Sequence, residues 1–188
     1  MNPETKLDLA EHVLVQSIRD FESLKKLGDK SLAQLSEAGF RWVPDPESNS
    51  IAIIINHLHG NMLSRWTDFL TTDGEKPDRN RDAEFEDDGA SSAELIARWE
   101  QGWATLLGTL KTLTPDDLLR TVTIRGEGHT VVQAVHRQIS HYGYHVGQLV
   151  YAAKAYRSSA WRTLSIPKGG SSAFNAAKGE EAAERHKG

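Results

Sequence analysis

The sequence contains no cysteine among its 188 residues. This absence excludes a disulfide framework, a catalytic thiolate, an iron–sulfur cluster and every zinc site built with Cys. Any bound metal must therefore be held by histidine and carboxylate ligands, and any reactive thiol must be brought by a cosubstrate. Eight histidines are present, so the question is which of them converge.

Long apolar runs and a basic excess are lacking as well. No apolar run approaches the roughly 20 residues that span a bilayer, and the first residues, MNPETKLDLAEH, lack the basic and apolar regions of a signal peptide. Lys and Arg number 22 against 26 Asp and Glu, a formal charge of −4, whereas nucleic-acid binding needs a basic excess or face. We therefore expect a cytoplasmic protein with neither membrane nor nucleic acid as its partner.

Hydrophobic periodicity predicts four long helices. Apolar residues recur at three- and four-residue steps over about 6–28, 50–70, 91–110 and 130–156. Between and after them we expect a short helix at 31–38, a small β-arm or hairpin at 121–128 and an irregular segment at 157–175. The fold class is therefore all-α, a four-helix bundle in a single domain at 1–175. Residues 176–188 have no apolar anchor, and a frayed polar tail is expected there.

Several residues mark the ends of these helices. Gly28 predicts the end of the first helix, Asn49 or Ser50 caps the second, and Ser91 with Glu94 forms a capping box for the third. The polar segment 71–89 has few apolar anchors and predicts a long loop, which in a small domain is often functional or mobile.

His141 and His145 are the strongest candidates for metal ligands. They lie four residues apart in the predicted last helix, so they share one face, one turn apart. Two imidazoles so placed can reach one ion at zinc–nitrogen distances of about 2.0–2.1 Å. Tyr142 follows the first His where a zinc protease of the HExxH type has Glu, and a protease is therefore not expected.

A third ligand must come from another helix. His57 and His59 differ by about 200° around the helix axis, so only one of them can join the pair. The apolar stripe of their helix mildly favours His59, and periodicity leaves both open. Gln148 and Asn61 are candidates to orient a ligand, with a surface amide as the alternative for each. Arg65 and Asp68 are interpreted as a solvated pair or as interface charges.

The pattern HxxxHxGQ, which ends at Gln148 and follows an earlier helical His, resembles the DinB/YfiT-like superfamily of metal-binding four-helix proteins. NHLHGNMLSRWTDFLTTDGEKPDRNRDAEF and LSIPKGGSSAFN resemble an uncharacterised subgroup of it, and the likeness extends to about residue 175. It implies a divalent metal, zinc or nickel, on His57, His141 and His145, with His59 in reserve. Val146 stands where many members have a basic residue.

The resemblance also implies an activity. Characterised members of the superfamily include thiol transferases and isomerases that use low-molecular-weight thiols, and others resemble metal-dependent hydrolases. We therefore expect a metal-dependent enzyme with a small-molecule substrate and a thiol cosubstrate. A hydrolase and a non-catalytic metal-binding bundle are the alternatives, and a homodimer is expected from the resemblance alone.

Overall fold

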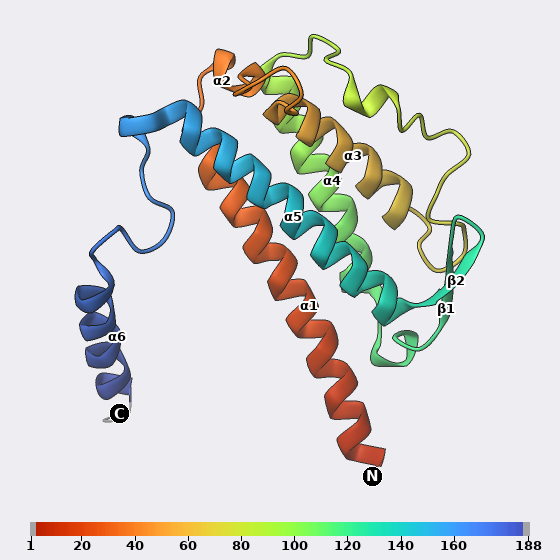
Figure 1. The fold of residues 1–188 in the computed structure, drawn as a ribbon. Coiled ribbons are helices and arrows are strands. Elements are labelled where there is room, and N and C mark those ends of the chain that lie inside the picture. Colours follow the sequence, from red (N-terminus) through yellow and green to blue (C-terminus); the bar gives the residue numbers. More distant parts are fainter. Residues whose placement is uncertain (1–2, 186–188) are drawn as a thin grey trace.

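The computed structural model describes the backbone of residues 3–185 and the side chains of residues 9–179. Its four long helices form a bundle (Figure 1): α1 (Pro3–Leu32), α3 (Ile51–Trp66), α4 (Ser92–Thr112) and α5 (Val131–Arg157). Helices α1 and α3 each pack against both α4 and α5. The predicted all-α bundle is thereby confirmed.

The centre of the bundle is a cluster of four buried aromatic rings, one from each long helix. Phe21 lies 6.1 Å from Trp66, 6.5 Å from Trp103 and 5.9 Å from Tyr142, measured between ring centroids. Trp66 Nε1 donates a hydrogen bond of 3.1 Å to the Tyr142 hydroxyl. Tilted and edge-on ring contacts of this kind have a defined geometry, so the cluster holds α3 and α5 in a fixed relation beside the histidines that they carry.

The helix limits were predicted in part. Ser50 and Ser91 cap α3 and α4 as expected, and the Ser91–Glu94 capping box is complete. Gly28 does not end α1, which continues to Leu32; instead a Cβ at Gly28 would overlap the Trp99 ring of α4, so the glycine permits close helix packing. The short helix expected at 31–38 lies later, as α2 (Glu37–Arg41). Helix α3 ends at Trp66 rather than near residue 70.

The predicted β-arm is present as an antiparallel hairpin of β1 (Thr121–Ile124) and β2 (Glu127–Thr130). Arg125 and Gly126 form its two-residue turn at φ values of 55° and 78°, the left-handed conformation that short hairpin turns require. The strands lead directly into α5, whose N-cap is Thr130.

The segment between α3 and α4 is an ordered cover rather than a free loop. It includes a 3-10 turn, η1 (Ala83–Phe85), and runs beside α3 in Figure 1. Gly74 N donates to Thr123 O at 2.8 Å, and the carboxylate of Asp73 accepts from the backbone N–H groups of Arg125 and Gly126 at 2.8 Å each. The hairpin thus anchors this segment and sets its path along α3.

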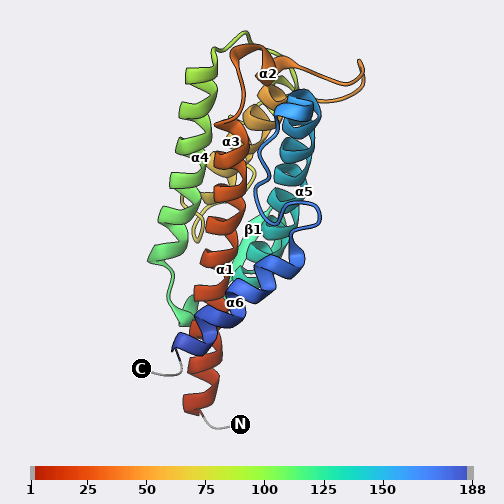
Figure 2. The same cartoon turned by 90° about the vertical axis from the view of Figure 1, so that its left-hand side faces the viewer.

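The C-terminal part of the chain differs from the irregular segment and frayed tail that the sequence predicted. After η3 (Ser158–Ala160) and an irregular stretch, residues Ser171–Arg185 form α6, where irregular chain and a frayed tail were expected. The segment AAKGEEAAER is rich in good helix formers, which outweigh the lack of an apolar stripe. Helix α6 lies to one side of the bundle and crosses the view in front of it when the molecule is turned (Figures 1 and 2). No helix within the described range combines the length and the apolar character needed to cross a membrane.

Candidate metal centre

Three histidines from two helices meet between α3 and α5. His57 Nε2 lies 3.3 Å from His141 Nε2, and His145 Nε2 lies 3.2 Å from the same atom. Within the described part of the chain, these residues are the one group of three or more His, Asp or Glu close enough to share an ion, with ligand atoms within 4.8 Å of one another. The structure therefore brings together the three residues that the resemblance implied.

His59 does not join this group. It is half-buried, and its Nε2 lies 3.0 Å from Gln101 Oε1 of α4. The weak preference for His59 from the apolar stripe is therefore wrong. Helix α3 is buried on two sides, against α4 and against α5. Its apolar residues therefore cover much of the helix circumference, and their positions do not indicate which of the two histidines faces α5.

The outer nitrogen of each histidine contacts a side-chain oxygen. His57 Nδ1 lies 2.9 Å from Glu84 Oε2, His141 Nδ1 lies 3.3 Å from Gln138 Oε1, and His145 Nδ1 lies 2.9 Å from Gln148 Oε1. Because these oxygens accept, each Nδ1 carries the hydrogen and each Nε2 presents a lone pair to the centre. An ion about 2.0 Å from each nitrogen in tetrahedral geometry would separate the nitrogens by about 3.3 Å. The two distances to His141 Nε2 match this value, and all three ligand atoms lie within 4.8 Å of one another, so the donor set can hold a metal.

The residues that orient the histidines were found only in part. Gln148 has the orienting role considered for it, whereas the Oδ1 of Asn61 accepts a hydrogen bond of 2.8 Å from the Tyr142 hydroxyl. Gln138 was missed, although it stands three residues before His141 as Gln148 stands three after His145, a spacing at which helical side chains meet. Glu84 lies 27 residues from His57 along the chain, and no local pattern connects them.

Glu84 is fixed on both sides. Arg79 donates from Nε to Oε1 at 2.7 Å and from Nη2 to Oε2 at 2.8 Å, a bidentate pair. Burial alone would raise the pKa of Glu84, but the hydrogen bonds from His57 and Arg79 outweigh it and hold the pKa below its ordinary value. Gly60 makes this approach possible, because a Cβ there would overlap the Glu84 carboxylate. Glu84 is therefore an ionised acceptor for His57.

The histidines of α5 are neutral at physiological pH. Burial, followed by the neighbouring charges of His145 and His57, lowers the pKa of His141 to about 3. Burial and the charge of His57 lower the pKa of His145 to about 4. Neutral imidazole is the form that binds a metal, so the pair is ready to act as ligands without losing a proton at pH 7.

The three histidines open into a cavity of about 450 Å³. Phe85 lines it with its ring centroid 4.7 Å from that of His57, and Tyr144, which is 60% exposed, lines its mouth. Arg65 also lines it, buried, and this corrects the interpretation of Arg65 as a solvated or interface charge. The site is thus reachable by a small molecule.

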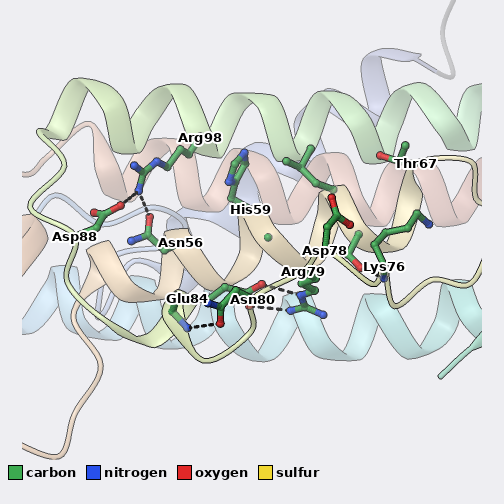
Figure 3. A pocket seen from close by; sticks show the side chains of 14 residues that line it. Asn56, His59, Thr67, Lys76, Asp78, Arg79, Asn80, Glu84, Asp88 and Arg98 are labelled. Carbon is green, nitrogen blue, oxygen red and sulfur yellow. Dashed lines mark hydrogen bonds and ion pairs between the residues drawn. The ribbon is translucent and has the colours of Figure 1, made fainter.

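A second cavity, of about 640 Å³, lies on the α4 side of α3 (Figure 3). His59 and Asn56 line it from α3 and Arg98 from α4, and Arg98 Nη1 donates to Asn56 Oδ1 at 2.7 Å and to Asp88 Oδ2 at 2.6 Å. Arg79 and Glu84 line this cavity too. The Arg79–Glu84 pair therefore lies between the two cavities, where Glu84 contacts His57 of the histidine cluster.

Comparisons with known proteins give one match. A family model described as "Protein of unknown function (DUF1572)" matches residues 8–170. No curated protein and no solved structure matches the chain.

Proposed function

Because this chain belongs to the DUF1572 family, whose description names no activity, we propose its function from the site itself: a divalent-metal-dependent enzyme that acts on a small molecule. The observation that carries the proposal is the convergence of three Nε2 lone pairs while every Nδ1 is engaged by an outer oxygen. Such outer contacts fix the tautomer and orientation of metal-bound histidines. Buried imidazoles need acceptors in any core, so it is the convergence of the three Nε2 atoms, together with these contacts, that favours a metal site.

The proposed metal is zinc or nickel. Both ions accept a set of imidazole nitrogens, and the resemblance of the HxxxHxGQ segment to the DinB/YfiT-like superfamily supports the same choice. Three protein ligands leave a coordination position for water or substrate, which distinguishes catalytic from structural zinc sites. The adjoining cavity of about 450 Å³ supplies the space for that position, and this favours an enzyme over a non-catalytic bundle.

The chemistry follows from the donor set. A bound ion would lower the pKa of a coordinated thiol or water and so supply a nucleophile at neutral pH. The chain's own residues hold and orient the ligands: Glu84 keeps His57 in one tautomer, and Gln138 and Gln148 do the same for the α5 pair. Since the chain has no cysteine, we propose a low-molecular-weight thiol as cosubstrate. In the proposed transfer the thiol loses its proton, its sulfur bonds to an electrophilic carbon of the small molecule, and the group that this carbon carried departs with the bonding electron pair. A hydrolase, with water as nucleophile, is the alternative.

Metal analysis is the direct test. Purified protein equilibrated with zinc or nickel is expected to hold about one ion per chain, and the His141→Ala and His145→Ala variants to hold none while remaining folded by circular dichroism. Full stoichiometry in either variant, or no uptake by the unmodified chain, would overturn the proposed site.

The activity is tested next, by measuring the rate at which a small electrophilic substrate is consumed with and without an added thiol. A rate that depends on the thiol indicates the transferase, and a rate that does not indicates the hydrolase. Sedimentation velocity tests the homodimer that belongs to the same proposal.

A further inference from the structure

The cavity beside the histidines is lined by five arginines. They come from α3, the α3–α4 segment, the hairpin turn and α5: Arg65, Arg79, Arg81, Arg125 and Arg137. None of the described residues that line this cavity is an aspartate or a glutamate. A metal ion on the three histidines would add further positive charge to the same space. The net charge of the cavity therefore depends on carboxylates that contact these arginines from outside the cavity.

Two carboxylates stand behind the arginines and neutralise some of them. Glu84 and Glu75 both pair with Arg79, at 2.7 Å and 3.1 Å. Glu75 also lies 3.3 Å from Arg125 Nε. Arg81 lies over the Phe85 ring at 5.0 Å. Among the described residues, Arg65, Arg81 and Arg137 have no carboxylate within hydrogen-bond distance. Because the Phe85 ring already engages Arg81, Arg65 and Arg137 are the two considered further.

Arg65 is enclosed and has no hydrogen-bond partner in the described structure. It is 3% exposed, its Nε and Nη1 have no partner, and its Nη2 reaches Glu75 Oε2 only at 3.9 Å. Leaving a buried charged donor unpaired is costly. The backbone is nevertheless shaped to hold it, because a Cβ at Gly74 would lie 2.6 Å from Arg65 Nη1. A guanidinium held this closely beside the cavity, with its carboxylate beyond hydrogen-bond distance, points to a ligand that supplies a hydrogen-bond acceptor.

Arg137 faces the same cavity from α5. It stands four residues before His141, so it lies on the histidine face one turn earlier, and it lines the cavity while remaining exposed. Within the described residues it has no hydrogen bond or ion pair. Its charge acts on Arg65, because burial and the nearby Arg137 and Arg79 guanidinium groups together lower the pKa of Arg65.

We propose that Arg65 and Arg137 bind an anionic oxygen group of the substrate, a carboxylate or a phosphate, beside the metal. The planar fork of a guanidinium matches both groups. An anion would provide the missing partner of Arg65 and relieve its repulsion with Arg137. This proposal rests on the proposed function for the position of the reacting group, and it narrows the substrate from a small molecule to a small acid or phosphorylated molecule. The binding of the anion itself does not require the metal.

Calorimetric titration with inorganic phosphate and, separately, with succinate tests the proposal. Each is added to metal-free and to zinc-loaded protein. At least one anion is expected to bind, and Arg65→Met and Arg137→Gln are each expected to weaken it about tenfold or more, as loss of a charged hydrogen bond does. Arg19→Gln is the matched control, because it removes the same charge from an exposed position of α1 outside the cavity, and it should bind as the unmodified chain does. Preference for phosphate or for succinate identifies which oxygen group the site takes.

The outcomes separate this proposal from the metal site. Anion binding that depends on Arg65 and Arg137 in protein that takes up no metal would leave this proposal standing and overturn the metal site alone. Metal uptake with no anion binding, or with binding unchanged in Arg65→Met and Arg137→Gln, would overturn the anion site alone. The melting temperature of Arg65→Met excludes a purely structural role, because removal of a buried charge that has no hydrogen-bond partner should leave the melting temperature unchanged or raise it. Arg137→Gln tests the anion site independently at an exposed position.

Discussion

Two cavities flank α3, and they use the same kinds of residue in different ways. His57 faces the α5 side and His59 the α4 side, two residues apart. On the α4 side Arg98 is paired with Asp88 and Asn56 (Figure 3). His59 on the same side contacts Gln101 of α4. On the α5 side the histidine lone pairs converge and Arg65 has no hydrogen-bond partner among the described residues. Polar groups that already satisfy one another only hold the structure together, whereas groups left unsatisfied are available to bind a ligand.

Single alanine substitutions of the two histidines of α3 should give the largest difference in zinc affinity between the two cavities. His57→Ala is expected to weaken zinc binding more than about 100-fold, beyond the 10–100-fold typical of an outer partner, because it removes a ligand. His59→Ala should leave the affinity unchanged. Competition against a chromophoric chelator measures both, and the reverse order would transfer the third ligand to His59.

The two carboxylates of the α3–α4 segment provide the next comparison. Glu84→Gln is expected to lower zinc affinity about 10–100-fold, because a neutral amide binds His57 Nδ1–H less strongly than a carboxylate does. Asp88→Asn alters the Arg98 pair in the other cavity and should have no effect on zinc. Equal affinities in the two variants, by the same competition assay, would show that Glu84 does not support the centre.

Alanine substitutions at two helical glycines test whether close packing at Gly60 holds Glu84 in place, with Gly108 as the control. Gly60→Ala should displace the Glu84 carboxylate, because the new Cβ would occupy its place. A loss of zinc affinity of about tenfold, at the lower end of the Glu84 effect, is expected. Gly108→Ala on α4 has open space around it and should raise the free energy of unfolding by up to about 1 kcal/mol, the helix preference of Ala over Gly, with zinc binding unchanged. Urea unfolding measures the stability of both variants and zinc titration measures their affinity. Unchanged zinc affinity in Gly60→Ala would contradict the role given to the Gly60–Glu84 contact.

The smallest effect is expected where neither cavity is touched. Ser91→Ala removes the side-chain cap of α4 and should lower the free energy of unfolding by about 1 kcal/mol. Zinc affinity should not change, since the histidines lie on α3 and α5. Urea unfolding monitored by circular dichroism measures the loss, and a change in zinc affinity of the same size would mean that the centre responds to bundle stability in general.

Short-range features were predictable because their causes lie within a few residues. The His141–His145 pair, the caps at Ser50 and Ser91 and the hairpin before α5 depend on helical spacing, a side-chain oxygen next to a free N–H, and a turn. Gln148 belongs to the same class. Gln138 does too, and the same spacing argument would have found it.

Long-range features were not predictable from periodicity. Gly28 reads locally as a helix end, but its place is set by Trp99 on another helix. Arg65 reads as a surface charge, but the α3–α4 segment covers it with Gly74. In both cases the deciding neighbour is more than eight residues away, and a helical wheel contains no such neighbour.

By itself the sequence determined that any metal must be held without cysteine thiolate, that four amphipathic helices form the bundle, and that two histidines share one face. These follow from composition and from the 3.6-residue turn of the helix. Only the tertiary structure decided that His57 rather than His59 faces that pair, that Glu84 holds it, and that Arg65 is buried without a hydrogen-bond partner beside them. Each of these features depends on which element packs against a given side of α3. Because α3 is buried on both sides, its hydrophobic periodicity does not distinguish the side that faces α4 from the side that faces α5.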